Sequence, residues 1–148
     1  MNKFVIASIV ALATTVATAT EVGVTATHDV NSDRNSVGVT VGNRYGDVGV
    51  TAGFDRTNAG AVDQNRYSLV GSYDVARVGA VTVDVRGGVG YLDNSGVADG
   101  YVGLVGVGAT LPVTNTVSAT VDVTRQYGQD RVSQYDGNRV TVGLKYKF

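Results

Sequence analysis

The 148-residue chain contains no cysteine and no tryptophan, and it has only one proline, one histidine and one methionine. Without cysteine, disulfide bonds, thiolate metal sites and cysteine nucleophiles are excluded. Charged residues are few and nearly balanced, with 12 Lys+Arg against 13 Asp+Glu. A chain with no basic excess lacks the electrostatic attraction on which nucleic-acid binding depends, so we expect no nucleic-acid partner.

The composition is instead rich in valine and glycine. The chain is 43% hydrophobic and contains 20 glycines. Its apolar content is mostly valine, a β-branched residue that favours strands over helices. The length is below the range in which hydrophobic cores divide, so the composition predicts one all-β domain.

The first nineteen residues differ from the rest of the chain. Lys3 precedes an apolar run over residues 4–13, and the small residues Ala17, Thr18 and Ala19 follow. Ten apolar residues are too few to cross a hydrocarbon core of about 30 Å as a helix. The pattern predicts a secretory signal peptide over residues 1–19 and a mature domain over residues 20–148.

The mature chain alternates apolar and polar residues in segment after segment, with no helical period. Alternation with a period of two is typical of strands that have one apolar face. Most of the segments are nine to twelve residues long, which exceeds the usual strand. The predicted strands span residues 21–30, 35–45, 47–55, 65–75, 80–91, 100–112, 116–127 and 138–148.

The connections between these segments alternate in length. Short turns are expected at Gly46 and at residues 76–79 and 113–115, whereas longer polar stretches cover residues 56–64, 92–99 and 128–137. The stretch 31–34 is the shortest of the long set. An up-and-down meander with one short-turn end and one loop end follows, which predicts an eight-stranded antiparallel barrel.

One apolar face per strand fits both a soluble lipocalin-like barrel, apolar inside, and a transmembrane barrel, apolar outside. A water-facing strand surface normally carries lysine and glutamate, but residues 20–148 contain two lysines and one glutamate. The alternate positions are mostly glycine, threonine and serine. Because small side chains suit the narrow lumen of an eight-stranded barrel, we expect valine to face lipid.

Aromatic residues cluster at the ends of the predicted strands. In a bilayer, such rings form belts at the two interfaces, about 25 Å apart. One belt is expected beside the long loops, and the other beside the short turns and the C-terminus. Their members are Phe54, Tyr67, Tyr91, Tyr101 and Tyr127 in the first belt, and Tyr45, Tyr73, Tyr146 and Phe148 in the second.

These features together resemble the small eight-stranded outer-membrane barrels of Gram-negative bacteria, of the OmpX-like and OmpA-transmembrane-domain-like porin family. The resemblance covers the mature chain and includes the alternation that ends at Tyr146 and Phe148. It implies a monomer in the cell outer membrane, reached after export, with lipid and lipopolysaccharide as partners. It also implies that the barrel-insertion machinery recognises the pattern that ends in Phe148.

Asp84, Arg86 and Asp122 lie in the inward phase of the strands near the middle of the barrel, and Lys145 lies lower on the last strand. We expect them to form a salt-bridge network that plugs the lumen, since eight strands leave little room. The alternative is a narrow pore for ions or small solutes, which the many inward glycines favour.

No catalytic, cofactor or metal site is expected. The only histidine, His28, is followed two positions later by Val30, and Ser32 lies in the predicted loop, so no His–Ser pair shares a strand face. Arg125 and Arg131 lie near the loop end, where cations could bind lipopolysaccharide phosphates. We therefore expect a non-enzymatic barrel that contributes to envelope integrity and binds an unknown extracellular ligand through its loops.

Overall fold

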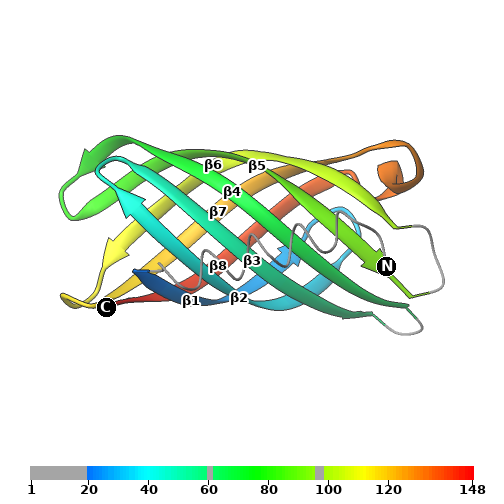
Figure 1. The fold of residues 1–148 in the computed structure, drawn as a ribbon, viewed down its shortest axis with the longest axis horizontal. Coiled ribbons are helices and arrows are strands. Elements are labelled where there is room, and N and C mark those ends of the chain that lie inside the picture. Colours follow the sequence, from blue (N-terminus) through cyan, green and yellow to red (C-terminus); the bar gives the residue numbers. More distant parts are fainter. Residues whose placement is uncertain (1–19, 60–61, 96–98) are drawn as a thin grey trace.

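Eight strands pair in sequence order and close into one antiparallel barrel in the computed structural model, which describes residues 20–59, 62–95 and 99–148 (Figure 1). β1 pairs with β2 on one side and with β8 on the other, which closes the barrel. The predicted signal peptide, residues 1–19, lies outside the described residues. The strands are β1 (Glu21–Asp29), β2 (Arg34–Tyr45), β3 (Val48–Ala59), β4 (Val62–Val78), β5 (Val81–Asn94), β6 (Gly100–Pro112), β7 (Val117–Gly128) and β8 (Gly137–Lys147). The predicted all-β fold and its up-and-down order are confirmed.

Valine faces outward along every strand. Val24 on β1, Val89 on β5 and Val123 on β7 are all exposed, as are most of the other large apolar residues. Among the described residues, the buried apolar side chains are Ala52, Leu92, Val102 and Val132. A soluble barrel would bury its valines, so the lipocalin-like alternative is wrong and the apolar band is the lipid-facing surface.

The two ends of the barrel differ (Figure 1). Three short turns lie at one end, and two of them contain Gly46 and Gly79 in the left-handed region at φ 61°. The C-terminus lies at the same end, where the Phe148 amide donates a hydrogen bond to the Thr20 carbonyl oxygen. The other four connections lie at the opposite end, called the outer end below. This division agrees with the predicted short-turn and loop ends.

One predicted long loop is largely strand, and another is partly strand. β3 continues to Ala59 and β4 begins at Val62, so the predicted loop 56–64 is mostly a paired hairpin, and residues 60–61 lie outside the described residues. Arg56 and Asp63 form an ion pair of 3.1 Å across it. β5 likewise continues to Asn94. The polar residues of these two segments led to the prediction of loops. Cross-strand pairs of polar residues also stabilise strands beyond the apolar band, so the strands continue there.

The predicted turn 76–79 is also shorter than expected. β4 extends to Val78, and the register shifts between Asp74 and Ala76, which marks a β-bulge. The third predicted loop, 128–137, contains a 3₁₀ helix, η1 (Asp130–Tyr135). No helix in the described part of the chain is long and apolar enough to span a membrane, a finding that does not concern barrels.

The orientation predicts how an outward charge affects stability. We expect Val123→Arg, at the middle of β7, to lower the free energy of unfolding by about 2–4 kcal/mol, because a charge at the bilayer midplane is poorly solvated. Val78→Arg, beside the Gly79 turn, should cost about 0–1 kcal/mol. Urea unfolding of the protein in lipid vesicles measures both values. Equal costs at the two depths would contradict the lipid-facing assignment.

Candidate functional site in the barrel lumen

The lumen contains small, hydroxyl and charged residues, and its narrow bore makes glycine necessary at close approaches. A Cβ atom on Gly108 of β6 would lie 2.6 Å from both Arg86 Cζ and Asp122 Oδ1. A side chain at this position would therefore displace the ion pair beside it. Gly108 thus occupies an inward position, as expected for a narrow lumen. Its missing side chain leaves space for charged groups from the neighbouring strands.

The central charges form one cluster. Arg86 on β5 donates hydrogen bonds from Nε and Nη2 to the two carboxylate oxygens of Asp84, at 2.8 and 2.9 Å. Arg86 Nη1 lies 2.6 Å from Asp122 Oδ1 on β7. Asp84 is 1% exposed. The structure thus brings together three of the four charges singled out in the sequence, and their side chains link β5 to β7 over Gly108 of β6.

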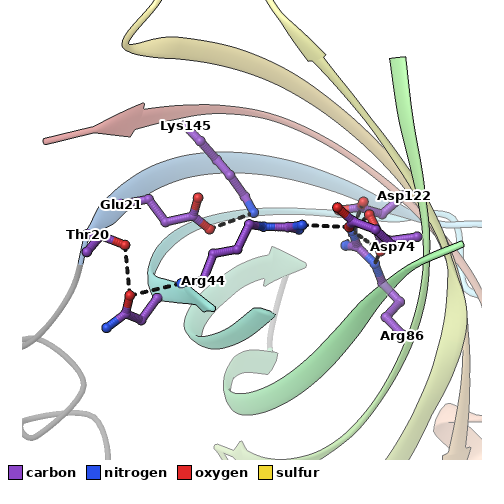
Figure 2. A network of polar contacts seen from close by, with 9 residues as sticks. Thr20, Glu21, Arg44, Asp74, Arg86, Asp122 and Lys145 are labelled. Atoms are coloured by element: carbon purple, nitrogen blue, oxygen red, sulfur yellow. Dashed lines mark hydrogen bonds and ion pairs between the residues drawn. The ribbon is translucent and has the colours of Figure 1, made fainter. Parts of the chain in front are cut away.

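Lys145 lies closer to the short-turn end and forms a different pair. Its Nζ is 3.1 Å from Glu21 Oε1 on β1. Beside it, Arg44 Nη1 of β2 donates to Asp74 Oδ1 of β4 at 2.6 Å (Figure 2). Figure 2 shows Glu21, Lys145 and Arg44 to the left of Arg86 and Asp122, with the Arg44 guanidinium extending toward Asp74. Arg44 and Asp74 were not among the predicted lumen charges, although each occupies the inward phase of its strand.

A further polar layer crosses the lumen toward the outer end. Arg66 on β4 donates from Nε and Nη2 to Asp55 Oδ2 on β3, at 3.2 and 3.1 Å. Its Nη1 donates to Gln126 Oε1 on β7 at 2.9 Å. Gln126 Nε2 in turn donates to the Tyr135 carbonyl oxygen of η1 at 2.9 Å. The sequence prediction missed this layer, which the inward phase of Arg66 and Gln126 could have indicated.

η1 packs into the outer end of the lumen against β5 and β6. Val132 is fully buried against Leu92 of β5 and Val102 of β6, with Leu104 and Tyr135 packed beside them. The predicted polar loop 128–137 is therefore partly an apolar plug and not wholly a solvent-facing loop. Strand periodicity could not reveal this contact, because Val132 belongs to a 3₁₀ helix that has no strand alternation.

A cavity of about 110 Å³ lies between the central cluster and the outer polar layer. Its lining is rich in hydroxyl groups and in charged side chains of both signs, and it includes Thr25, Thr120, Arg66, Arg139, Asp55 and Asp122. A second cavity of about 10 Å³ lies at the outer mouth. Arg66 and Arg139 line both cavities, so these two side chains separate them.

On the exterior, four aromatic residues stand in register across β3, β4, β5 and β6 at the outer end. The register pairs Phe54 with Tyr67, Tyr67 with Tyr91, and Tyr91 with Tyr101. The ring centroids of the first and last pairs are 5.3 and 5.2 Å apart. These contacts form a row over half of the barrel.

Most of the other predicted belt residues lie at or beside strand ends, whereas Tyr73 lies within β4, opposite the first residue of β3. The Arg125 guanidinium lies over the Tyr127 ring, 5.3 Å from its centroid, on the exposed face of β7. At the short-turn end, the Tyr146 and Phe148 rings meet edge to face at 5.4 Å, and Tyr45 and Tyr73 are exposed. Arg131 belongs to η1, but its side chain lies outside the described part of the structure.

His28 has polar neighbours but no serine partner. Its Nδ1 shares a hydrogen bond with Asn35 Oδ1 at 2.9 Å, and its Nε2 lies 3.9 Å from Asp33 Oδ1. The Ser32 amide instead donates to Asp29 Oδ1, within the turn after β1. Within residues 20–59, 62–95 and 99–148, no group of three metal-ligating side chains gathers.

The closed barrel, its apolar exterior and its polar lumen define a transmembrane β-barrel of the smallest class. No model of a protein family matches the chain, and no curated protein matches it. Among solved structures, Neisserial surface protein A (NspA) is similar to it, with 16% sequence identity and a TM-score of 0.61. The match covers 86% of this chain and 94% of NspA.

Two further barrels have similar folds. The outer membrane enzyme PagL has 13% identity and a TM-score of 0.56, over 86% of this chain and 98% of PagL. Ail, the attachment invasion locus protein of Yersinia pestis, has 13% identity and a TM-score of 0.52, over 86% and 95% of the two chains. The chain thus has the fold of the small eight-stranded outer-membrane barrels, as the resemblance in its sequence implied. At these identities the likeness concerns fold and not function.

The central cluster predicts a strong effect of removing its cation. Arg86→Met should lower the free energy of unfolding by about 3–5 kcal/mol, because it leaves two buried carboxylates without a counter-charge. Adding Asp84→Asn and Asp122→Asn should recover part of the loss. Urea unfolding in vesicles measures each step. Arg77→Met is the control, because Arg77 is exposed and its pairs of 3.6 and 3.8 Å should contribute about 0–1 kcal/mol.

Proposed function

We propose that the protein is an integral outer-membrane barrel that contributes to envelope integrity and to surface interactions, without enzymatic activity. The observation that carries this proposal is the combination of an apolar exterior with a lumen crossed by ion pairs and plugged by Val132. Such a barrel is a rigid frame held in lipid. Its outer end presents polar segments to the exterior, where binding depends on what they display.

Export through a cleaved signal peptide and insertion as a monomer belong to the same proposal. Phe148 is exposed at the end of β8, beside Tyr146, where the insertion machinery could contact it. The short-turn end would face the periplasm, because outer-membrane barrels have short periplasmic turns and longer extracellular loops. The outer end would then lie among lipopolysaccharide headgroups.

The polar contacts of His28 support a non-enzymatic role. In a hydrolase, a histidine base activates a nucleophile within hydrogen-bond reach, and a third group orients that histidine. His28 instead shares its hydrogen bond with the Asn35 side chain, and the Ser32 amide is bound to Asp29. PagL shows that this fold can carry an enzyme, so the argument depends on these contacts and not on the fold.

A narrow pore is the second candidate, and the cavity of about 110 Å³ favours it. For a solute to pass, the Arg86 pairs and the contacts of Arg66 would have to open together. Both sets of contacts hold buried charges in short ion pairs, whose loss costs several kcal/mol. A lumen that these ion pairs block to solutes is therefore the favoured state.

Heat modifiability and conductance test the proposal together. We expect the unboiled protein from isolated outer membranes to migrate differently from the boiled protein in SDS electrophoresis, because a closed barrel resists SDS until it is heated. In planar bilayers the same protein should give no conductance steps. Regular steps would favour the pore, and a soluble protein with no mobility shift would contradict the barrel in the membrane.

The Arg125 position predicts a role at the lipid headgroups. Reversing the charge with Arg125→Glu and Arg131→Glu should sensitise cells to detergents and chelators, because cations at this height would bind lipopolysaccharide phosphates. Growth inhibition measures the effect at equal amounts of heat-modifiable barrel. Arg77→Glu, an exposed reversal at the short-turn end, is the matched control and should leave sensitivity unchanged. Unchanged sensitivity in the double variant would rule out the contact.

A further inference from the structure

The outward apolar run differs in length from strand to strand. On β5 the outward positions from Val81 to Tyr91 carry no polar side chain, and the same is true from Tyr101 to Leu111 on β6. On β1 and β2, on the other side of the barrel, each run has only three residues. These are Val22, Val24 and Ala26 on β1, and Val37, Val39 and Val41 on β2.

The short runs cover only part of the membrane. With a rise of about 3.4 Å per residue and a strand tilt of about 40°, the run from Val81 to Tyr91 spans about 26 Å along the membrane normal. By the same measure, the run from Val22 to Ala26 spans only about 10 Å. The apolar band of an outer-membrane barrel is about 25 Å tall. β5 therefore matches an ordinary membrane, whereas β1 and β2 cover less than half of it.

Polar side chains bound the short runs at both ends. Toward the outer end, His28 on β1 faces Asn35 on β2, and His28 Nδ1 shares a hydrogen bond of 2.9 Å with Asn35 Oδ1. Toward the short-turn end, Thr20 Oγ1 donates to Asn43 Oδ1 at 3.0 Å, and Asn43 Nδ2 donates to the Tyr45 hydroxyl at 2.9 Å. Both strands thus have polar groups on the lipid-facing side above and below their valines.

These polar groups are costly to place in hydrocarbon. One shared hydrogen bond satisfies only part of the polar groups of an imidazole and a carboxamide, and the rest need water or lipid headgroups. A bilayer adapts to a short apolar stretch by thinning beside it, at a modest cost per ångström. Tilting the whole barrel does not help, because tilt raises or lowers a face as a unit and this face is bounded at both ends.

We propose that the exterior of β1 and β2 thins the bilayer beside it, so that its partner is a lipid surface with shortened or disordered acyl chains. Water and headgroups reach the level of His28 and Asn35 on one side and of Thr20 and Asn43 on the other. The bilayer keeps its ordinary thickness beside β5 and β6. The inference rests on the lipid-facing barrel and is independent of what the outer end binds.

The strands are staggered around the barrel, which fixes the relative heights of residues on different strands. Following the paired residues from Glu21 on β1 through β2 and onward ends at Gly137 on β8. Gly137 lies beside Asn31, since a Cβ atom on it would be 2.9 Å from Asn31 Oδ1. One circuit of eight strands therefore climbs by ten residues, from position 21 to position 31, toward the outer end.

This stagger gives a matched pair of positions on the thin and thick faces. The paired residues lead in four strand steps from Ala26 on β1 to Asp93 on β5, which is a climb of five residues. Val89 lies four residues below Asp93 on the same strand. Val89 is therefore about one residue, or about 3 Å along the strand, nearer the outer end than Ala26.

Spin labels at these two positions test the proposal. The chain has no cysteine, so Ala26→Cys and Val89→Cys each carry a single nitroxide. Electron paramagnetic resonance then measures how well a water-soluble nickel complex reaches each label in fluid vesicles of dimyristoleoyl or dieicosenoyl phosphatidylcholine. We expect higher accessibility at position 26 than at position 89, with the larger difference in the thicker dieicosenoyl bilayer. A bilayer of uniform thickness would favour position 89, so that result, or equal values, would overturn the proposal.

Variants that lengthen the apolar runs locate the effect. Combining His28→Val, Asn35→Val and Asn43→Val with the label at position 26 should lower its nickel accessibility to the level of position 89. The matched control combines His28→Asn, Asn35→Ser and Asn43→Ser, which changes the hydrogen bonds but keeps the border polar, and it should leave the accessibility high. Unchanged accessibility in the valine variant would overturn the assignment to these residues. If the valine variant does not fold, the comparison of the two labels in the native background decides alone.

A second copy of the chain is the competing occupant of this face. Val39 lies at the middle of the β2 run and is 55% exposed, so a label on Val39→Cys would be close to the neighbouring copy in such a dimer. Dipolar broadening that disappears on dilution with unlabelled barrel would show a second copy there and overturn the lipid assignment. A spectrum that dilution leaves unchanged supports it.

These measurements concern only the barrel in vesicles. Their failure would leave the proposed envelope function standing, because heat modifiability and detergent sensitivity do not depend on local thickness. The proposed function could fail in cells while the labels still report a thin face. The two proposals are therefore distinguishable.

Discussion

Every structural feature of this barrel depends on the pairing of β1 with β8. In hydrocarbon, no water is present to satisfy backbone N–H and C=O groups, so an open sheet edge would leave a row of them without partners. The ladder between Glu21 and Lys147 at one end and Asp29 and Arg139 at the other removes both edges at once. Once the edges are closed, outward positions can be apolar throughout, and the polar residues must share the lumen.

The narrow lumen explains why the chain is rich in glycine and has few long polar side chains. An eight-stranded barrel has an interior only wide enough for side chains, so large inward residues on neighbouring strands compete for space. The inward positions are mostly glycine, threonine and serine, with a few long charged residues among them. Gly108 makes room for the charged side chains of Arg86 and Asp122. The charges then pair across the lumen and link strands that are not neighbours in the sheet, such as β5 with β7 and β2 with β4.

Strand periodicity in the sequence was sufficient to predict the fold, because each strand reports its own apolar face. The same periodicity places Asp84, Arg86 and Asp122 inside, where they meet. Periodicity could not show that Lys145 pairs with Glu21, because the partner of an inward charge depends on how far each strand is shifted along its neighbour. Nor could it reveal Val132, which packs into the lumen from a 3₁₀ helix without strand alternation.

The β3–β4 hairpin has a further consequence for the outer surface. Its strands stay paired for five residues beyond Phe54 on β3, up to the pairing of Ala59 with Val62. At about 3.3 Å per residue, this is about 16 Å of ladder beyond the aromatic row. Cross-strand backbone hydrogen bonds hold the residues of this ladder in fewer conformations than an unpaired loop of the same length would have. A partner that binds this hairpin would therefore cost it less conformational entropy than binding to an unpaired loop.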